Sequence, residues 1–288
     1  NAMFAGMTPA NIAKVQPQWW KEEQAKGSKN AHESDLLGAQ LDRWGFSGQW
    51  GYHKITDVVS GRKLVEDFHQ IRDRDFTAVV FNFVDMLSHA RSEMEVIKEL
   101  ADDEAAYRSL THSWFVHSPL KHMLDAMAEM GGRVVLTTDH GTMRVDHPVE
   151  VRGDRATNAN LRYKVGKNLG YNAEDVMEVK QPDKVGLPKP NVSSTYIFAK
   201  TRDFLVYPNN ASRYVKTFRN SFQHGGVSME EMIIPFVQIW NPMMMEYKDD
   251  KDIKDFISRI MSYFTIVGLI FLIPGIIFSL ELSSFLIN

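Results

Sequence analysis

The sequence predicts an α/β fold in which helices flank a largely parallel central sheet. Residues 76–85, FTAVVFNFVD, and residues 131–141, GGRVVLTTDHG, each contain a short and nearly continuous apolar run. Such runs are typical of strands that are buried on both faces. Residues 92–130 between them are predicted to form a long helical region. A strand, a helical region and a second strand make the βαβ unit of parallel sheets.

The flanking segments complete this pattern. Residues 16–35 are polar and rich in turn-forming residues, which predicts an exposed loop. Residues 61–74 have apolar residues at helical spacing. Three later apolar segments are predicted to be strands: 193–200, 204–208 and 232–240. The folded domain is therefore expected to span residues 1–242.

The C-terminal part of the chain differs from this domain. A charged linker is expected over residues 243–259, and residues 260–280, IMSYFTIVGLIFLIPGIIFSL, contain no charged residue. This segment is long enough to cross a bilayer. If it inserts, Arg259 and the lysines before it predict that the domain faces the cytoplasm. The alternative is that a foreign tail follows a domain that needs no membrane.

Composition excludes several kinds of site. The net charge of −3 over 288 residues gives no reason to expect a surface for polyanions. The chain has no cysteine, which excludes disulfides, zinc–thiolate sites and thiol nucleophiles. The lack of cysteine is compatible with a cytoplasmic location. A transition-metal site would have to use His, Asp and Glu.

Three motifs contain side chains of that kind at the ends of predicted strands. Asp85 ends the first strand, and His89 follows four residues later. Asp139 and His140 end the second strand, and His224 stands before two glycines and the last strand. In parallel sheets, sites assemble at the carboxyl ends of the strands. Carboxylate and imidazole ligands suit zinc, manganese or iron.

Each of these residues also has an ordinary structural interpretation. An aspartate at a strand end commonly caps a helix, and an isolated histidine commonly packs or faces solvent. The metal hypothesis therefore depends on the joint placement of three motifs, not on any single match.

The motif order D-x-x-x-H, T-x-D-H-G and H-G-G resembles the alkaline phosphatase superfamily. Two segments, TTDHGTMRVDHPVEVRGDRATNANLRYKVGKNLGY and QHGGVSMEEMIIPFV, resemble more closely the PglZ domain of PorX-type response regulators, which are associated with type IX secretion. The resemblance covers about residues 1–240. It implies a three-layer sandwich with a two-metal site, with zinc expected and manganese possible. It also implies that Asp85, His89 and His224 hold one ion and that Asp139 and His140 hold the other.

The resemblance also implies a nucleophilic threonine or serine and an early aspartate, and neither is found. Both are expected upstream of residue 1, together with the first strand of the sheet. Thr8, the first hydroxyl residue, precedes Pro9 in a predicted turn and comes too late for the role. The chain is therefore expected to be N-terminally truncated and inactive as this fragment.

The implied activity is hydrolysis of phosphate mono- or diesters, with nucleotide-type substrates. Arg155 and Arg162 are candidates for contact with the substrate or with a structural carboxylate, because guanidinium groups suit both. A homodimer and a signalling partner in type IX secretion are the expected partners. The alternative is a non-catalytic module for dimerisation or partner docking, in which the metals are structural.

Overall fold

A computed structural model of the chain describes residues 1–21, 30–83, 86–87, 94–100, 103–153, 157–234 and 236–239. The chain divides into two compact units. The first comprises Asn1–Leu124 and Val135–Gln238, and the second comprises Asp125–Val134 and Ile239–Asn288. The candidate site lies in the first unit.

The chain begins with three helices: α1 (Ala2–Ala5), α2 (Pro9–Val15) and α3 (Glu33–Arg43). The α2 helix begins where a cap and a proline predict it to begin. The backbone N–H of Asn11 donates to Thr8 Oγ1 at 3.4 Å, and Pro9 is the first helical residue. Thr8 therefore acts as a helix cap.

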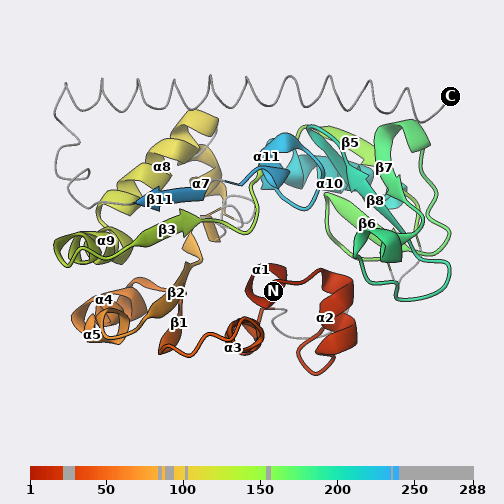
Figure 1. Ribbon diagram of the computed structural model, residues 1–288. Coiled ribbons are helices and arrows are strands. Elements are labelled where there is room, and N and C mark those ends of the chain that lie inside the picture. Colours follow the sequence, from red (N-terminus) through yellow and green to blue (C-terminus); the bar gives the residue numbers. More distant parts are fainter. Residues whose placement is uncertain are drawn as a thin grey trace, which may run out of the picture. The chain divides into compact units, whose positions relative to one another are not determined.

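A βαβ unit follows, made of β1 (Trp50–Ile55), α4 (Val58–Glu66), α5 (His69–Arg72) and β2 (Phe76–Phe81). The strands β1 and β2 pair in parallel, from Trp50 opposite Phe76 to Ile55 opposite Phe81 (Figure 1). The predicted strand within residues 76–85 is confirmed over 76–81. The predicted helix over 61–74 is confirmed as two helices.

The helical region predicted over 92–130 is confirmed as three helices: α7 (Glu95–Leu100), α8 (Glu104–Val116) and α9 (Pro119–Glu129). Local chemistry sets the ends of α8 and α9. The Asp103 side chain accepts from Ala106 N at 2.7 Å and starts α8, and Pro119 is the first residue of α9.

The next strand, β3 (Val134–Thr137), pairs with β11 (Phe236–Ile239). The sequence correctly predicts both strands but overestimates the burial of β3. Val135 is 48% exposed and Leu136 is 39% exposed.

The rest of the first unit consists of small sheets and short helices. The strands are β4 (Met143–Arg144), β5 (His147–Glu150), β6 (Tyr163–Gly166), β7 (Val176–Val179), β8 (Thr195–Ala199), β9 (Asp203–Val206) and β10 (Phe222–Gln223). The helices are α10 (Ala211–Phe218), α11 (Met229–Met232) and three 3-10 turns, η1 (Ala173–Asp175), η2 (Pro182–Val185) and η3 (Pro208–Asn210). The predicted strands at 193–200 and 204–208 are thus confirmed as β8 and β9.

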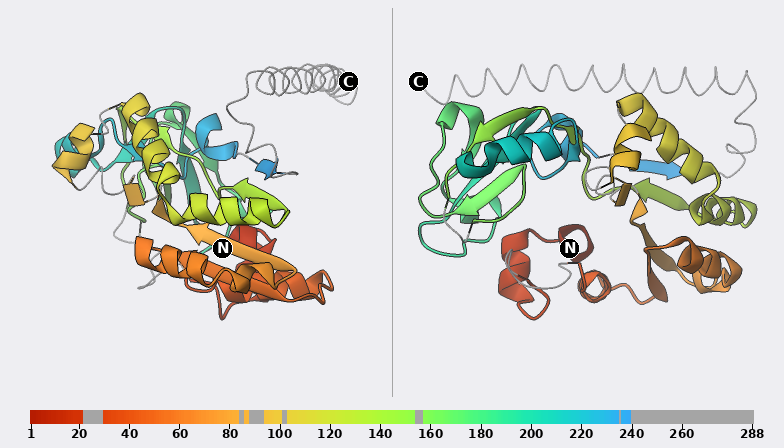
Figure 2. Two further views of the ribbon diagram at one scale, coloured as in Figure 1. Left: turned by 90° about the vertical axis from the view of Figure 1, so that its left-hand side faces the viewer. Right: turned by 180° about the vertical axis from the view of Figure 1, so that it is seen from behind.

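Two hydrophobic clusters hold these elements together. One contains the buried side chains of Val149, Val151, Val176, Ile197, Ala199 and Leu205. The other contains Val145, Leu161, Phe204 and Val206, and side chains of α10 pack against it. Phe204 and Leu205 alternate between the two clusters, so β9 contributes to both. Figure 2 shows these elements from two further directions.

The described residues do not show the large parallel sheet that the sequence predicts. The described strands form five small sheets, of which β1–β2 and β5–β9 are parallel pairs. The β10–β4 pair and the β6–β8–β7 sheet are antiparallel. The α/β class is therefore confirmed, whereas a single parallel sheet is not formed by the described strands. Two-residue strands such as β4 and β10 carry too few apolar residues to be recognised by periodicity.

Among the helices that the structure describes, none is long and apolar enough to span a bilayer. The predicted linker over 243–259 and the apolar segment over 260–280 lie outside the described residues.

Candidate metal centre

Asp139 and His140 lie in the turn that follows β3. The Nδ1 atom of His140 is 3.0 Å from the carbonyl oxygen of Gly141. A carbonyl oxygen only accepts, so Nδ1 carries the proton and donates. This leaves the lone pair on Nε2, which lies 3.7 Å from Asp139 Oδ1. The turn therefore presents an imidazole nitrogen and a carboxylate side by side, which is the donor chemistry that zinc and manganese accept.

His224 reaches the same place from a different part of the chain. It follows β10 and precedes Gly225 and Gly226. Its ring stacks on that of His140, with centroids 3.9 Å apart and an interplanar angle of 11°. Two of the three motifs that the sequence singles out are therefore brought together.

The stacked geometry fits two neighbouring ions better than one shared ion. The two ring planes are nearly parallel, so their in-plane lone pairs do not converge on a single ion. His140 is 33% exposed and Asp139 is 63% exposed, so an ion has access from solvent. The imidazole and carboxylate donors thus suit zinc or manganese in their chemistry.

Asp85, His89 and Arg155 lie outside the described residues. Within the described ranges, no three His, Asp or Glu side chains converge as a group that could hold an ion. Asp139, His140 and His224 therefore do not by themselves form a metal site among the residues that the structure describes.

Arg162 is fully buried, and protein groups surround its guanidinium. Its Nε donates to Glu231 Oε1 at 2.8 Å, and its Nη2 donates to the other oxygen of the same carboxylate. Its Nη1 donates to the backbone oxygens of Lys200 and Asp203. Of the two roles considered for Arg162, this geometry supports contact with a structural carboxylate.

Sequence analysis missed the role of Glu231. Its carboxylate accepts from Gly226 N at 2.9 Å and from Ser228 Oγ at 2.7 Å. Burial raises the pKa of Glu231, but the hydrogen bonds from Arg162, Gly226 and Ser228 outweigh it and hold the pKa below its ordinary value. The signal was present in the sequence, since S-M-E-E at 228–231 is the capping-box pattern that α11 adopts.

A second buried carboxylate, that of Glu33 on α3, was also missed. It accepts from Tyr52 Oη at 2.6 Å and from Lys54 Nζ at 2.7 Å. No motif in the sequence marks Glu33, because its partners come from β1.

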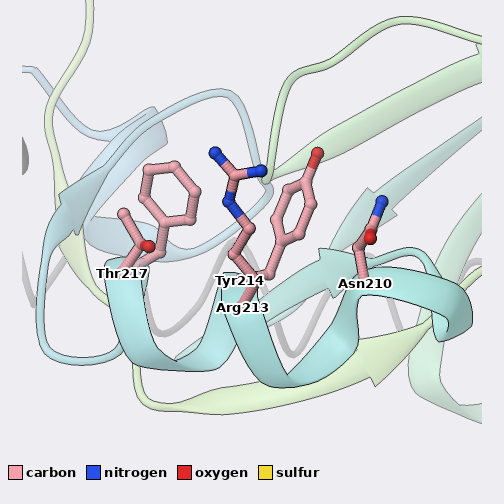
Figure 3. Close-up of a pocket in the computed structure, with 5 residues that line it drawn as sticks. Asn210, Arg213, Tyr214 and Thr217 are labelled. Carbon is pink, nitrogen blue, oxygen red and sulfur yellow. The ribbon is translucent and has the colours of Figure 1, made fainter.

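A surface hollow lies away from these motifs, over one face of α10 (Figure 3). It is lined by Asn210, Arg213, Tyr214, Thr217 and Phe218. All five side chains come from α10 or the residue before it. Tyr214 and Phe218 also pack against the core. The hollow therefore results from the packing of one helix and contains no motif residue.

A family model described as the BREX system PglZ alkaline phosphatase-like domain matches residues 1–239. The curated proteins contain no match to the chain. The matched residues include β3, β11 and all three motifs.

Proposed function

Because the chain belongs to the PglZ family of alkaline phosphatase-like domains, we propose that it is a metal-dependent phosphoric ester hydrolase domain. The proposed substrates are phosphate mono- and diesters of the nucleotide type. The observation that carries the proposal is the stack of His140 and His224, which brings two motifs that are distant in the sequence together beside Asp139.

The roles proposed for the residues follow from this arrangement. Asp139 and His140 hold one ion, and His224 holds the other together with Asp85 and His89. Two bound cations would supply activation of a hydroxyl nucleophile and stabilisation of the entering and leaving oxygens. The protein fixes the donors: the hydrogen bond from His140 Nδ1 to the Gly141 carbonyl sets the tautomer and the ring orientation.

We further propose that the domain is of the PorX type, and that it serves a response regulator linked to type IX secretion. The support is the sequence of two segments, residues 137–171 and 223–237. The first contains the Asp139-His140 turn and the second contains His224. Expression of the chain together with its upstream residues, in a secretion-competent cell that lacks its PorX-type protein, tests this point. Restored secretion supports it, and unchanged secretion in cells that contain the folded chain contradicts it.

Metal content is the first measurement for the hydrolase proposal. The chain is dialysed against a weak chelator, and zinc and manganese are then counted by elemental analysis. We expect a tightly held ion that is lost in His224→Ala but kept in His140→Ala, because the two histidines are assigned to different ions. A folded chain with no bound metal would overturn the two-metal proposal.

Hydrolysis is the second measurement. The expected nucleophile precedes Asn1, so the assay uses a chain that carries the upstream residues as well. Bis(p-nitrophenyl) phosphate and p-nitrophenyl phosphate are the probes for diester and monoester cleavage. Hydrolysis that disappears when the expected upstream threonine or serine is changed to alanine supports the hydrolase proposal. A metal-loaded dimer that cleaves neither probe would instead favour the non-catalytic docking module.

A further inference from the structure

The short helix α11 contacts both histidine-bearing loops. Its N-terminal end carries Ser228 and Glu231, which form a capping box. The loop that contains His224 runs directly into this helix, and the loop that contains His140 crosses it. The position of α11 therefore influences both rings of the stack.

The carboxylate of Glu231 ties down the His224 loop. It accepts from Gly226 N at 2.9 Å, from Ser228 N at 3.2 Å and from Ser228 Oγ at 2.7 Å. Gly226 has no space for a side chain. A Cβ there would lie 2.6 Å from Arg162 Nη2 and 2.8 Å from the Ala199 carbonyl oxygen. The loop after His224 thus lies directly against the Arg162–Glu231 pair.

The backbone of the same helix holds the His140 loop. Gly141 N donates to the Glu231 carbonyl oxygen at 3.1 Å. A Cβ at Gly141 would lie 1.8 Å from the Glu230 carbonyl oxygen, so only glycine permits this approach. The His140 ring itself is tied to Gly141 through Nδ1. Displacement of α11 would therefore move His140 as well.

Arg162 connects this helix to the core. It is 0% exposed, and it links the Glu231 carboxylate to the backbone of Lys200 and Asp203 in the β8–β9 connection. A guanidinium paired with both oxygens of one carboxylate has a defined orientation. The chain of contacts runs from the core through Arg162 and Glu231 to both histidine loops.

We propose that Glu231, held by Arg162, is the positioning residue that keeps His140 and His224 stacked. The inference rests on the proposed function in one respect: the stacked rings are taken to be metal ligands, and Glu231 would keep them correctly spaced. The geometric claim itself concerns the metal-free chain.

The test compares Glu231→Gln with Glu230→Gln in the full chain. Both changes remove one negative charge, but Glu230 is exposed and only Glu231 is buried among the loop contacts. The probes are the ring resonances of ¹⁵N- and ¹³C-labelled histidine, with His140 and His224 assigned from their own glutamine variants. We expect Glu231→Gln to shift both sets of ring resonances and to weaken the contact peaks between the rings. Glu230→Gln should leave them unchanged.

Because Glu231→Gln leaves the Arg162 charge buried without its partner, Ser228→Ala provides a milder change as a second variant. It removes one hydrogen bond to Glu231 and keeps the Arg162 pair. A shift of the His224 and His140 resonances, with those of His32, His69 and His117 unchanged, supports the inference. If Ser228→Ala folds and all histidine resonances stay in place, the inference is overturned, whether or not Glu231→Gln folds.

Zinc titration against a chromogenic chelator separates this inference from the proposed function. If both hold, the folded variant that displaces the rings binds zinc about 10- to 100-fold more weakly. Displaced rings in a chain that never binds zinc would leave the positioning role intact and remove the hydrolase proposal. Unchanged ring resonances together with normal zinc binding would overturn the positioning role of Glu231 and leave the hydrolase proposal intact.

Discussion

Lys164 is fully buried on β6, where its Nζ donates to the Asn158 carbonyl oxygen at 3.0 Å and lies 4.9 Å from the centre of the Tyr207 ring. Burial lowers the pKa of Lys164 to about 8. In the unfolded chain its pKa is about 10.4. Between these values the unfolded state binds more protons than the folded state, so stability should rise with pH.

We therefore expect Lys164→Met to remove this pH dependence. Between about pH 8 and 10, the free energy of unfolding of the unmodified chain should rise relative to that of Lys164→Met by up to about 1.4 kcal/mol per pH unit. Below pH 8 both states hold the proton, so the difference becomes constant. Urea unfolding of both proteins at several pH values measures the effect. Identical slopes would show that Lys164 keeps its ordinary pKa in the fold.

Gly141 allows a second prediction at the scale of one residue. An alanine Cβ there would meet the Glu230 carbonyl oxygen at 1.8 Å, and a backbone atom cannot move aside alone. We expect Gly141→Ala to lower the free energy of unfolding by about 1–3 kcal/mol, as overpacking commonly does. Gly170→Ala is the matched control, because its Cβ would meet its nearest neighbour, Arg152 Cβ, at 3.4 Å. Equal losses in the two variants would contradict the predicted contact.

The same residue shows how far the site can be predicted from the sequence. The order Asp139, His140, Gly141 predicts a ligand turn after a strand. The requirement for glycine comes from Glu230, which is distant in the sequence, so no local pattern reveals it. Likewise, the stack of His140 on His224 depends on tertiary contacts between distant segments, and no local pattern predicts it.

At the scale of elements, the local sequence predicts whether a helix or strand forms better than it predicts the residues at which the element begins and ends. The helical region over 92–130 is recognised by its sequence, but its division depends on caps such as Asp103 and on Pro119. These signals are readable in the sequence, because Asp at a helix start and Pro at its first position are common. The burial of β3 is not readable, since it depends on what covers the strand.

The Asp103 cap yields a prediction for α8. Asp103→Ala removes the acceptor for Ala106 N, which lies 2.7 Å from Oδ1. We expect the free energy of unfolding to fall by about 0.5–2 kcal/mol. Asp103→Asn should retain most of the stability, because an amide oxygen also caps. Chemical denaturation followed by far-ultraviolet circular dichroism gives both values, and an equal loss in the two variants would argue against capping.

At the scale of the whole molecule, the α/β class follows from the alternation of apolar runs and helical segments. The sheet organisation does not, because small antiparallel pairs such as β10–β4 form between segments that are far apart in the sequence. The three candidate metal-ligand motifs are recognised in the sequence by their placement at strand ends. Their energetic role, however, can only be measured on the folded chain.

Zinc binding should stabilise the folded chain if the histidine motifs hold ions, because the unfolded chain cannot keep His140 and His224 together. At a free zinc concentration about 100 times the dissociation constant, one site adds about 2.7 kcal/mol to the free energy of unfolding. Thermal unfolding with and without zinc measures this gain. His140→Ala and His224→Ala should each lose part of it, whereas His147→Ala should not, because His147 pairs with Asp203 on the surface at 2.8 Å. Equal stabilisation of all three variants would mean that zinc binds elsewhere and that the stacked histidines have another role.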